Sequence, residues 1–165
     1  MYATVQEMTL QYGLTEIAQL LDDEEGNISN ELLQAAIDGD TSSFSTEEQA
    51  AITRALSRAD AIIQQQMAFI DSRISRYPIP LSESNARSTP VHSCCMALAR
   101  AGFADDSTNL SEQVAKDRDY WREWLRDISS GKAVLPGISA VSNSSGTQQQ
   151  RLSGALKSSV DWERY

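Results

Sequence analysis

The sequence predicts an all-α protein, a small bundle of four to six helices built around one long helix and followed by an extended or disordered C-terminal tail. Three observations predict this fold class. Apolar residues recur at steps of three and four through one stretch of about thirty residues. Helix-start signatures stand before several shorter apolar stretches. No stretch alternates apolar and polar residues as a strand does, and no hairpin turn is visible.

The length of 165 residues suffices for one hydrophobic core, and a second full domain is not expected. We expect a helical domain at residues 1–135 and a flexible tail at residues 136–165. Residues 137–150 are rich in Ser, Gly, Asn and Gln, and they offer too little apolar surface to offset the entropy lost on ordering. Residues 150–165 regain large apolar side chains, which makes them a candidate docking segment.

Three short helices are expected before the long one. The first opens with a capping-box pattern, Thr4 with Glu7, and Gly13 ends it through a left-handed cap. Thr15 is expected to cap the second helix. The remaining predicted boundaries are an acidic turn at 22–27, a third helix at 29–38 and a loop at 39–43.

The long helix is expected to begin after Ser45, which forms a capping box with Glu48. It is expected to end at Tyr77, because Pro78 lacks an amide proton and disfavours the helical conformation in the residue before it. Pro80 holds the next residues extended. At about 1.5 Å per residue this helix spans roughly 45 Å, and its apolar stripe needs partners along most of that length.

The polar stretch S-E-S-N-A-R-S-T-P-V is expected to be a loop that ends where Thr89 and Pro90 start the next helix. The many alanines of that helix permit close packing against the long one. A last helix is expected from Asn109 to Ser130, and its opposite charges at three and four residue spacings indicate a solvated face. We place Trp121 and Trp124 in the core, with Tyr120 outside their stripe.

The net charge of −9 and the pI near 4.5 argue against a surface that grips DNA phosphates, since such binding rests largely on Lys and Arg. A plain acidic surface and a surface that repels passing DNA both fit the composition. No apolar run approaches the roughly 20 residues of a membrane helix, and no signal peptide pattern opens the chain. We therefore expect no membrane association and synthesis in a cytoplasm.

No pattern of catalytic, cofactor-binding or metal-binding residues stands out, so neither an enzyme nor a cofactor nor a metal is expected. His92 precedes Cys94 and Cys95 in H-S-C-C, but a structural zinc site needs four ligands and no second cluster of Cys or His exists. The two cysteines are expected to be reduced and buried. Motifs for phosphate loops, dinucleotides and nucleophile elbows are missing.

Several short motifs occur together. They are Met1-Tyr2-Ala3-Thr4, Gly13, I-S-R-Y-P-I-P-L at 74–81, a helix that opens near Pro90, and I-x-x-G-K-x-x-L at 128–135. With these motifs the chain resembles the head-tail connector, or adaptor, proteins of Mu-like phages and prophages. R-Y-P-I-P-L is the most specific of them. The likeness covers about residues 1–135, while residues 22–45 and the tail after Leu135 depart from the pattern.

The resemblance implies a non-enzymatic structural protein of the virion neck, made in the host cytoplasm. It implies a homo-oligomeric ring beneath the portal, with a dodecamer as one expectation, that joins capsid to tail and extends the DNA channel. The implied partners are the portal protein and neighbouring connector or tail-completion proteins, and DNA passes without specific binding. The alternative hypothesis is a small helical regulatory or protein-binding adaptor that acts as a monomer or dimer.

Arg73, Arg76 and Arg87 flank the proline segment, where they form either a small basic site or, as we favour, a solvated helix end. A first set of candidate contact residues for the portal or a neighbouring subunit surrounds this segment. A second set lies in the C-terminal tail. The alternative for Tyr77, Ile79 and Leu81 is that they merely cover the core. The two candidate sets are Arg73, Arg76, Tyr77, Pro78, Ile79 and Pro80, and Leu152, Leu156, Trp162 and Tyr165.

Overall fold

One long helix organises the protein, and the sequence predicted it. The computed structural model describes residues 1–22, 28–105 and 111–141 and contains only helices within those ranges, so the all-α class is confirmed. Seven helices are present there, one more than expected. They are α1 (Val5–Tyr12), α2 (Leu14–Leu21), α3 (Asn30–Asp38), α4 (Thr46–Arg73), α5 (Glu83–Arg87), α6 (Val91–Asp105) and α7 (Glu112–Ser130).

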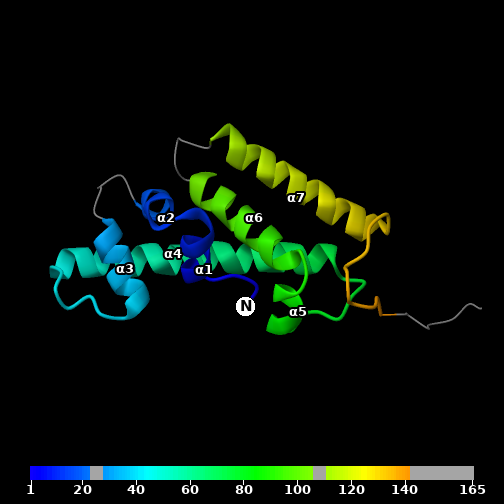
Figure 1. Cartoon of the computed structure of the whole chain (residues 1–165), viewed down its shortest axis with the longest axis horizontal. Helices are drawn as coiled ribbons and strands as arrows, with labels where there is room; N and C mark the ends of the chain where they lie inside the picture. Colours follow the sequence, from blue (N-terminus) through cyan, green and yellow to red (C-terminus); the bar gives the residue numbers. More distant parts are fainter. Residues whose placement is uncertain (23–27, 106–110, 142–165) are drawn as a thin grey trace, which may run out of the picture.

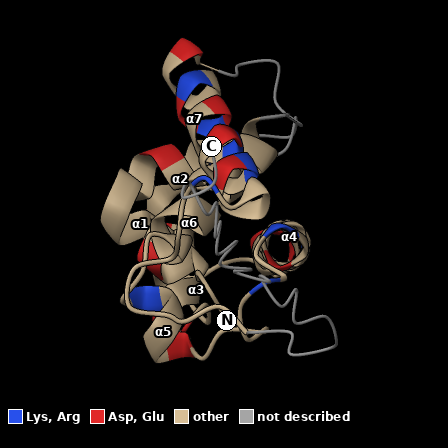
Figure 2. Ribbon diagram, turned by 90° about the vertical axis from the view of Figure 1, so that its right-hand side faces the viewer, with Lys and Arg blue, Asp and Glu red and all other residues tan. Residues whose placement is uncertain are grey.

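The 28 residues of α4 span about 42 Å and run the length of the molecule (Figure 1). Contacts join α4 to α1, α2, α3, α6 and α7. Its buried positions recur at helical spacing, as in Ile52, Ala59, Ile63 and Ile70. Figure 2 looks along α4 and shows the other helices gathered on one side of it. One face of α4 therefore carries the core.

The predicted start of α4 is confirmed and its predicted end is wrong. The hydroxyl of Ser45 accepts from the Glu48 amide at 3.3 Å, and the Glu48 carboxylate accepts from the Ser45 amide at 2.8 Å. The helix ends at Arg73, a turn before Tyr77, and the Tyr77 amide then donates to the Ile74 carbonyl at 2.9 Å. This tighter turn brings both Ile74 and Tyr77 into the core before the proline segment begins.

The predicted helix starts at Thr4 and Ser29 are confirmed, because both hydroxyls accept an amide of the first turn. Two details differ. Gly13 ends α1 with φ of 97° and ψ of 143°, a positive φ outside the left-handed helical region. The same glycine precedes α2, so Thr15 lies inside the first turn of that helix and does not cap it.

Further corrections concern the later helices. The predicted loop before Pro90 contains the short helix α5, which Ser82 caps by accepting from the Asn85 amide. Thr89 donates its hydroxyl to the Ala86 carbonyl, at the end of α5, and so does not cap α6. Helix α7 begins at Glu112 with Ser111 as its cap, three residues later than predicted.

Aromatic residues of α7 border the core. Trp121 and Trp124 are half-buried and pack against it, as predicted in part, while Tyr120 is 62% exposed. The three rings meet edge to face, with centroids 5.2 and 5.4 Å apart. Residues 136–141 are described, and Ile138 also packs against the core. Residues 23–27, 106–110 and 142–165 lie outside the described ranges, and with them most of the predicted acidic turn and all four candidate tail residues.

Candidate interaction surface

A buried tyrosine from the start of the chain fixes the proline segment after α4. The Tyr2 hydroxyl donates to the Asp71 carboxylate and accepts from the Leu81 amide at 2.8 Å. Burial, reinforced by the hydrogen bond to Asp71, raises the pKa of Tyr2 well above its usual value. The Tyr2 carbonyl accepts from Nδ1 of His92 at 2.6 Å, so this nitrogen carries the proton. The two ends of the segment 71–81 are thereby tied to one side chain.

The proline segment divides into inward and outward side chains. Tyr77 and Leu81 are buried and cover the core, and the Tyr77 hydroxyl accepts from the Leu135 amide at 3.0 Å. Pro78 and Pro80 are exposed, Ile79 is 46% exposed, and the peptide between Ile79 and Pro80 is cis. The core-covering interpretation thus holds for Tyr77 and Leu81, and Ile79 remains available for contact.

The segment after α7 lies beside the proline segment. The Val141 amide donates to the Arg76 carbonyl at 2.8 Å. Val134 and Val141 are 73% and 53% exposed. Together with the bond between Tyr77 and Leu135, these contacts hold the segment after α7 beside the proline segment, at one end of the molecule (Figure 1). Both segments carry exposed aliphatic and basic side chains. We call this surface the C-terminal corner, made of Arg76, Ile79, Lys132, Val134 and Val141.

Arg76 also packs against the C-terminal end of α7. Gly131 caps α7 in the left-handed conformation, and the Arg76 guanidinium occupies the space that a side chain at Gly131 would need. Helix α7 has no basic residue in its last turn. Arg76 therefore supplies, from the end of α4, the positive charge that a helix C-terminus favours.

The other two arginines of the predicted basic site differ in their surroundings. The Arg73 guanidinium lies 5.0 Å from the centre of the Phe69 ring. Arg87 forms ion pairs with Glu7 and Glu83, both at 2.7 Å, so its charge is neutralised. Within the part of the chain that the structure describes, neither Arg73 nor Arg76 nor Lys132 forms an ion pair.

A second surface lies near the other end of α4, around α3 (Figure 1). A shallow, open groove of about 470 Å³ has Leu14 and Ala35 in its lining. Asn30 and Gln34 also line it, and Glu31 and Asp38 contribute carboxylates. We call this surface the α3 groove. The first 53 residues of the chain contain eleven Asp and Glu and no Lys or Arg, so this end carries the negative charge of the protein.

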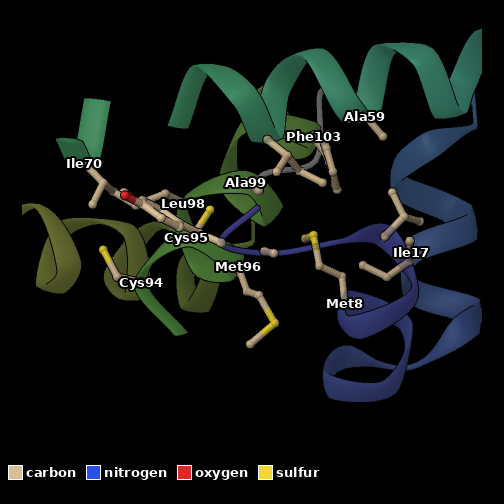
Figure 3. Packing of buried hydrophobic residues seen from close by; sticks show 14 of the residues in the cluster. Met8, Ile17, Ala59, Ile70, Cys94, Cys95, Met96, Leu98, Ala99 and Phe103 are labelled. Atoms are coloured by element: carbon tan, nitrogen blue, oxygen red, sulfur yellow. The ribbon is translucent and has the colours of Figure 1, made fainter. Parts of the chain in front are cut away.

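The H-S-C-C motif has a structural setting. Cys94 and Cys95 are free and buried, as predicted, among residues that include Met8 and Met96 (Figure 3). Burial raises the pKa of both thiols, that of Cys95 to about 12, so both stay protonated near neutral pH. No group of three His, Cys, Asp or Glu side chains suited to a metal is found among residues 1–22, 28–105 and 111–141. In the same ranges no helix has the length and apolar character of a membrane span.

Sequence reasoning missed three residues that brace the two surfaces. In the sequence Tyr2 stands out only as part of the motif Met1-Tyr2-Ala3-Thr4, and its partners lie 69 to 90 residues away. Arg100 contacts Glu16 and Asp117, at 2.5 and 3.7 Å, and its guanidinium lies over the Tyr12 ring. Gly102 lets α6 approach α4, since a Cβ there would lie 2.7 Å from Cγ2 of Ile62. No local pattern marks such contacts.

Comparison with protein families gives a match over most of the chain. The model of a family described as Bacteriophage Mu, Gp36 matches residues 2–153. This match includes residues 22–45 and continues beyond Leu135, where the likeness was expected to stop. No curated protein matches the chain.

Proposed function

The chain belongs to the bacteriophage Mu Gp36 family, and we propose that it is a head-tail connector that forms a ring beneath the portal and extends the DNA channel. Family membership makes it a protein of Mu-like phages and suggests a structural or morphogenetic role. The observation that carries the finer proposal is the pair of chemically opposite surfaces at the two ends of one braced helical unit. The proposal gives the chain no catalytic role.

A ring requires that each copy present two different surfaces, one to each neighbour. Such heterologous contacts close when the rotation per subunit divides the circle. A unit that keeps its shape suits this task. The contacts of Tyr2 tie the N-terminal segment to the end of α4, and those of Arg100 join α6 to α2 and α7. The C-terminal corner and the α3 groove lie on this unit as separate surfaces.

The charge distribution fits passage of DNA without specific binding. Because the first 53 residues contribute eleven acidic side chains and no Lys or Arg, a channel that they face repels phosphates. DNA then slides past the wall and is not held by it.

The tail is assigned a separate role. Residues 150–165, with Leu152, Leu156, Trp162 and Tyr165, are proposed to dock on the portal or on a neighbouring subunit, since a tether that orders on binding tolerates differences in symmetry. Deletion of residues 142–165 preserves the contact of Val141 with Arg76. We expect this deletion to weaken binding to purified portal at least tenfold, measured by interferometry; unchanged binding would remove the tail from the proposal.

Two measurements test the connector role. When portal is added, the native mass of the purified protein should increase in steps of one subunit until it reaches the mass of a closed ring. Electron cryomicroscopy of phage particles should show the helical unit, with its long α4, between portal and tail. A chain that stays a monomer or dimer with portal, and that appears nowhere in the neck, would instead fit the regulatory adaptor.

A further inference from the structure

The C-terminal corner and the α3 groove are complementary in charge, and each also offers apolar surface. The corner presents projecting aliphatic side chains, Ile79 and Val134, beside the charges of Arg76 and Lys132. The groove offers apolar lining between carboxylates. The positively charged corner is therefore suited to bind the negatively charged groove.

We propose that the C-terminal corner of one copy docks into the α3 groove of a second copy of this chain. Val134 and Ile79 fill the groove against Leu14 and Ala35, while Lys132 approaches the carboxylate of Asp38 and Arg76 that of Glu31. This assignment rests on the proposed function in one respect, because it names the contact that a ring would repeat.

The positions of the two surfaces exclude an internal contact. The corner follows the end of α4 and the α3 groove lies near its beginning (Figure 1), and α4 itself is about 42 Å long. One chain cannot bring them together while α4 is intact. A pair of copies joined in this way still has one free corner and one free groove, so further copies add to it. The assembly closes into a ring when the rotation per copy divides the circle.

The sharpest test mixes two single-site variants of the full chain. Val134→Asp disables the corner and leaves the groove, whereas Ala35→Glu fills the groove with a charged side chain and leaves the corner. By sedimentation velocity at 50 mM NaCl, each variant alone should remain a monomer up to 1 mM. Their mixture should give a one-to-one dimer that grows no further, because only one intact pair of surfaces exists.

A charge exchange tests the ionic part. Lys132→Asp and Asp38→Lys should each weaken self-association of the chain at least tenfold, and the double variant should recover most of that loss. Raising NaCl from 50 to 500 mM should weaken the unchanged chain and leave a remainder that the aliphatic contact supports. Circular dichroism confirms that each variant is folded.

Matched controls lie outside both surfaces. Leu10 on α1 is 82% exposed, so Leu10→Asp controls for Val134→Asp. Asp60 on α4 is exposed and controls for Asp38, and Arg122 on α7 is exposed and controls for Lys132. Reversal of charge at Asp60 or Arg122 should leave self-association unchanged.

Three results would overturn the contact: an unchanged chain that is monomeric at 1 mM in low salt, a mixture of the two variants that forms no dimer, or a dimer formed by either variant alone. These results concern purified protein only. The connector role is tested in phage particles. If the chain is found in the neck but the contact is absent, only the contact is wrong. If the contact forms but the chain is not in the neck, only the connector role is wrong.

Discussion

At the scale of single residues, two helix-capping glycines differ only in what surrounds them. Gly39 and Gly131 both end a helix in the left-handed conformation, with φ of 83° and 78°. Nothing lies within 4 Å of a side chain at Gly39, whereas the Arg76 guanidinium fills that space at Gly131. Gly39→Ala should lower the free energy of unfolding by about 1 kcal/mol, and Gly131→Ala by at least about 2 kcal/mol, in urea denaturation.

The difference between the two glycines is assigned to Arg76 by a third variant. In an Arg76→Ala background the obstruction is gone, so Gly131→Ala should cost about as much as Gly39→Ala. Equal losses for Gly39→Ala and Gly131→Ala in the unchanged chain would mean that Arg76 moves away freely.

The buried thiols make stability depend on alkaline pH. Burial holds the pKa of Cys94 and Cys95 above the value of about 9 that an unfolded chain gives. Above pH 9 the unfolded state therefore loses these protons while the folded state keeps them, and stability falls as pH rises. From pH 8 to pH 10.5 each thiol should remove about 2 kcal/mol of unfolding free energy.

Guanidinium denaturation at the two pH values measures this loss. Cys94→Ala should reduce the change between pH 8 and pH 10.5 by about 2 kcal/mol. Tyr2 and Tyr12, whose pKa values burial also raises, add to the loss above pH 10 and remain in the variant as an internal reference. A variant with the same change as the unchanged chain would show that Cys94 ionises in the folded state.

Residue-level features were predictable where the interaction is local. Thr4, Ser29 and Ser45 cap their helices through an amide three residues ahead, and spacing in the sequence reveals such pairs. The partners of Tyr2 stand far away in the chain, so no spacing indicates them. Its value to the fold follows only from the arrangement of helices.

At the scale of helices, the approach of α6 to α4 depends on Gly102. A Cβ at this position would lie 2.7 Å from Cγ2 of Ile62. This methyl group is attached directly to the branched Cβ of Ile62, whose rotation is restricted in a helix. Gly102→Ala should therefore lower the unfolding free energy by about 1 kcal/mol, although alanine is the better helix former by a similar amount. Thermal denaturation measures the sign.

The same substitution should change sign when the obstruction is removed. In an Ile62→Ala background the atom Cγ2 is gone, and Gly102→Ala should then stabilise the chain by up to about 1 kcal/mol. Additive losses in the double variant would place the strain elsewhere in the contact between α4 and α6.

Arg100 joins α6 to α2 and α7 from a position where only 15% of its side chain is exposed. Arg100→Met leaves the carboxylates of Glu16 and Asp117 without their partner and should cost about 2 kcal/mol in chemical denaturation. Arg87, also with two carboxylates, is 51% exposed and serves as the matched control. Arg87→Met should cost less than about 1 kcal/mol, because water screens exposed pairs. Equal costs would refute the role of burial.

The helices themselves were largely predictable, since apolar spacing and caps are properties of short segments. The exceptions have tertiary causes. Helix α4 ends early because Ile74 and Tyr77 are buried by partners outside the helix, including Leu135. Helix α5 has five residues, too few for a periodic pattern, and a neighbouring helix, α6, packs against it.

At the scale of the whole molecule, α4 contacts both the helices that precede it (α1, α2 and α3) and two that follow it (α6 and α7). The described helices should therefore unfold together. Ser45→Ala removes the cap at the start of α4, away from α7 (Figure 1), the helix that carries Trp121 and Trp124. The midpoint of thermal unfolding should fall by about 3 °C, equally by far-UV circular dichroism and by tryptophan emission. Ser43→Ala, in the exposed loop, is the control. Separate midpoints for the two probes would indicate two independent units.

The C-terminal corner was predictable only for the part that lies within one short segment of the sequence. R-Y-P-I-P-L identified the segment with Arg76 and Ile79, but Lys132, Val134 and Val141 reach it from after α7. The α3 groove combines Leu14 with residues of α3 and had no signature. Surfaces assembled from distant segments become visible only when the helices are in place.

The anchoring of Tyr2 bears on how the protein matures during translation. Tyr2 leaves the ribosome well before its partners do. Its hydroxyl contacts Asp71 and Leu81 and its carbonyl contacts His92, and all three are synthesised much later. Tyr2 must therefore wait for these partners, and closure of the core is deferred until His92 has emerged. Slowing elongation just downstream of codon 92 would lengthen that exposed interval and increase sensitivity of the nascent chain to proteases.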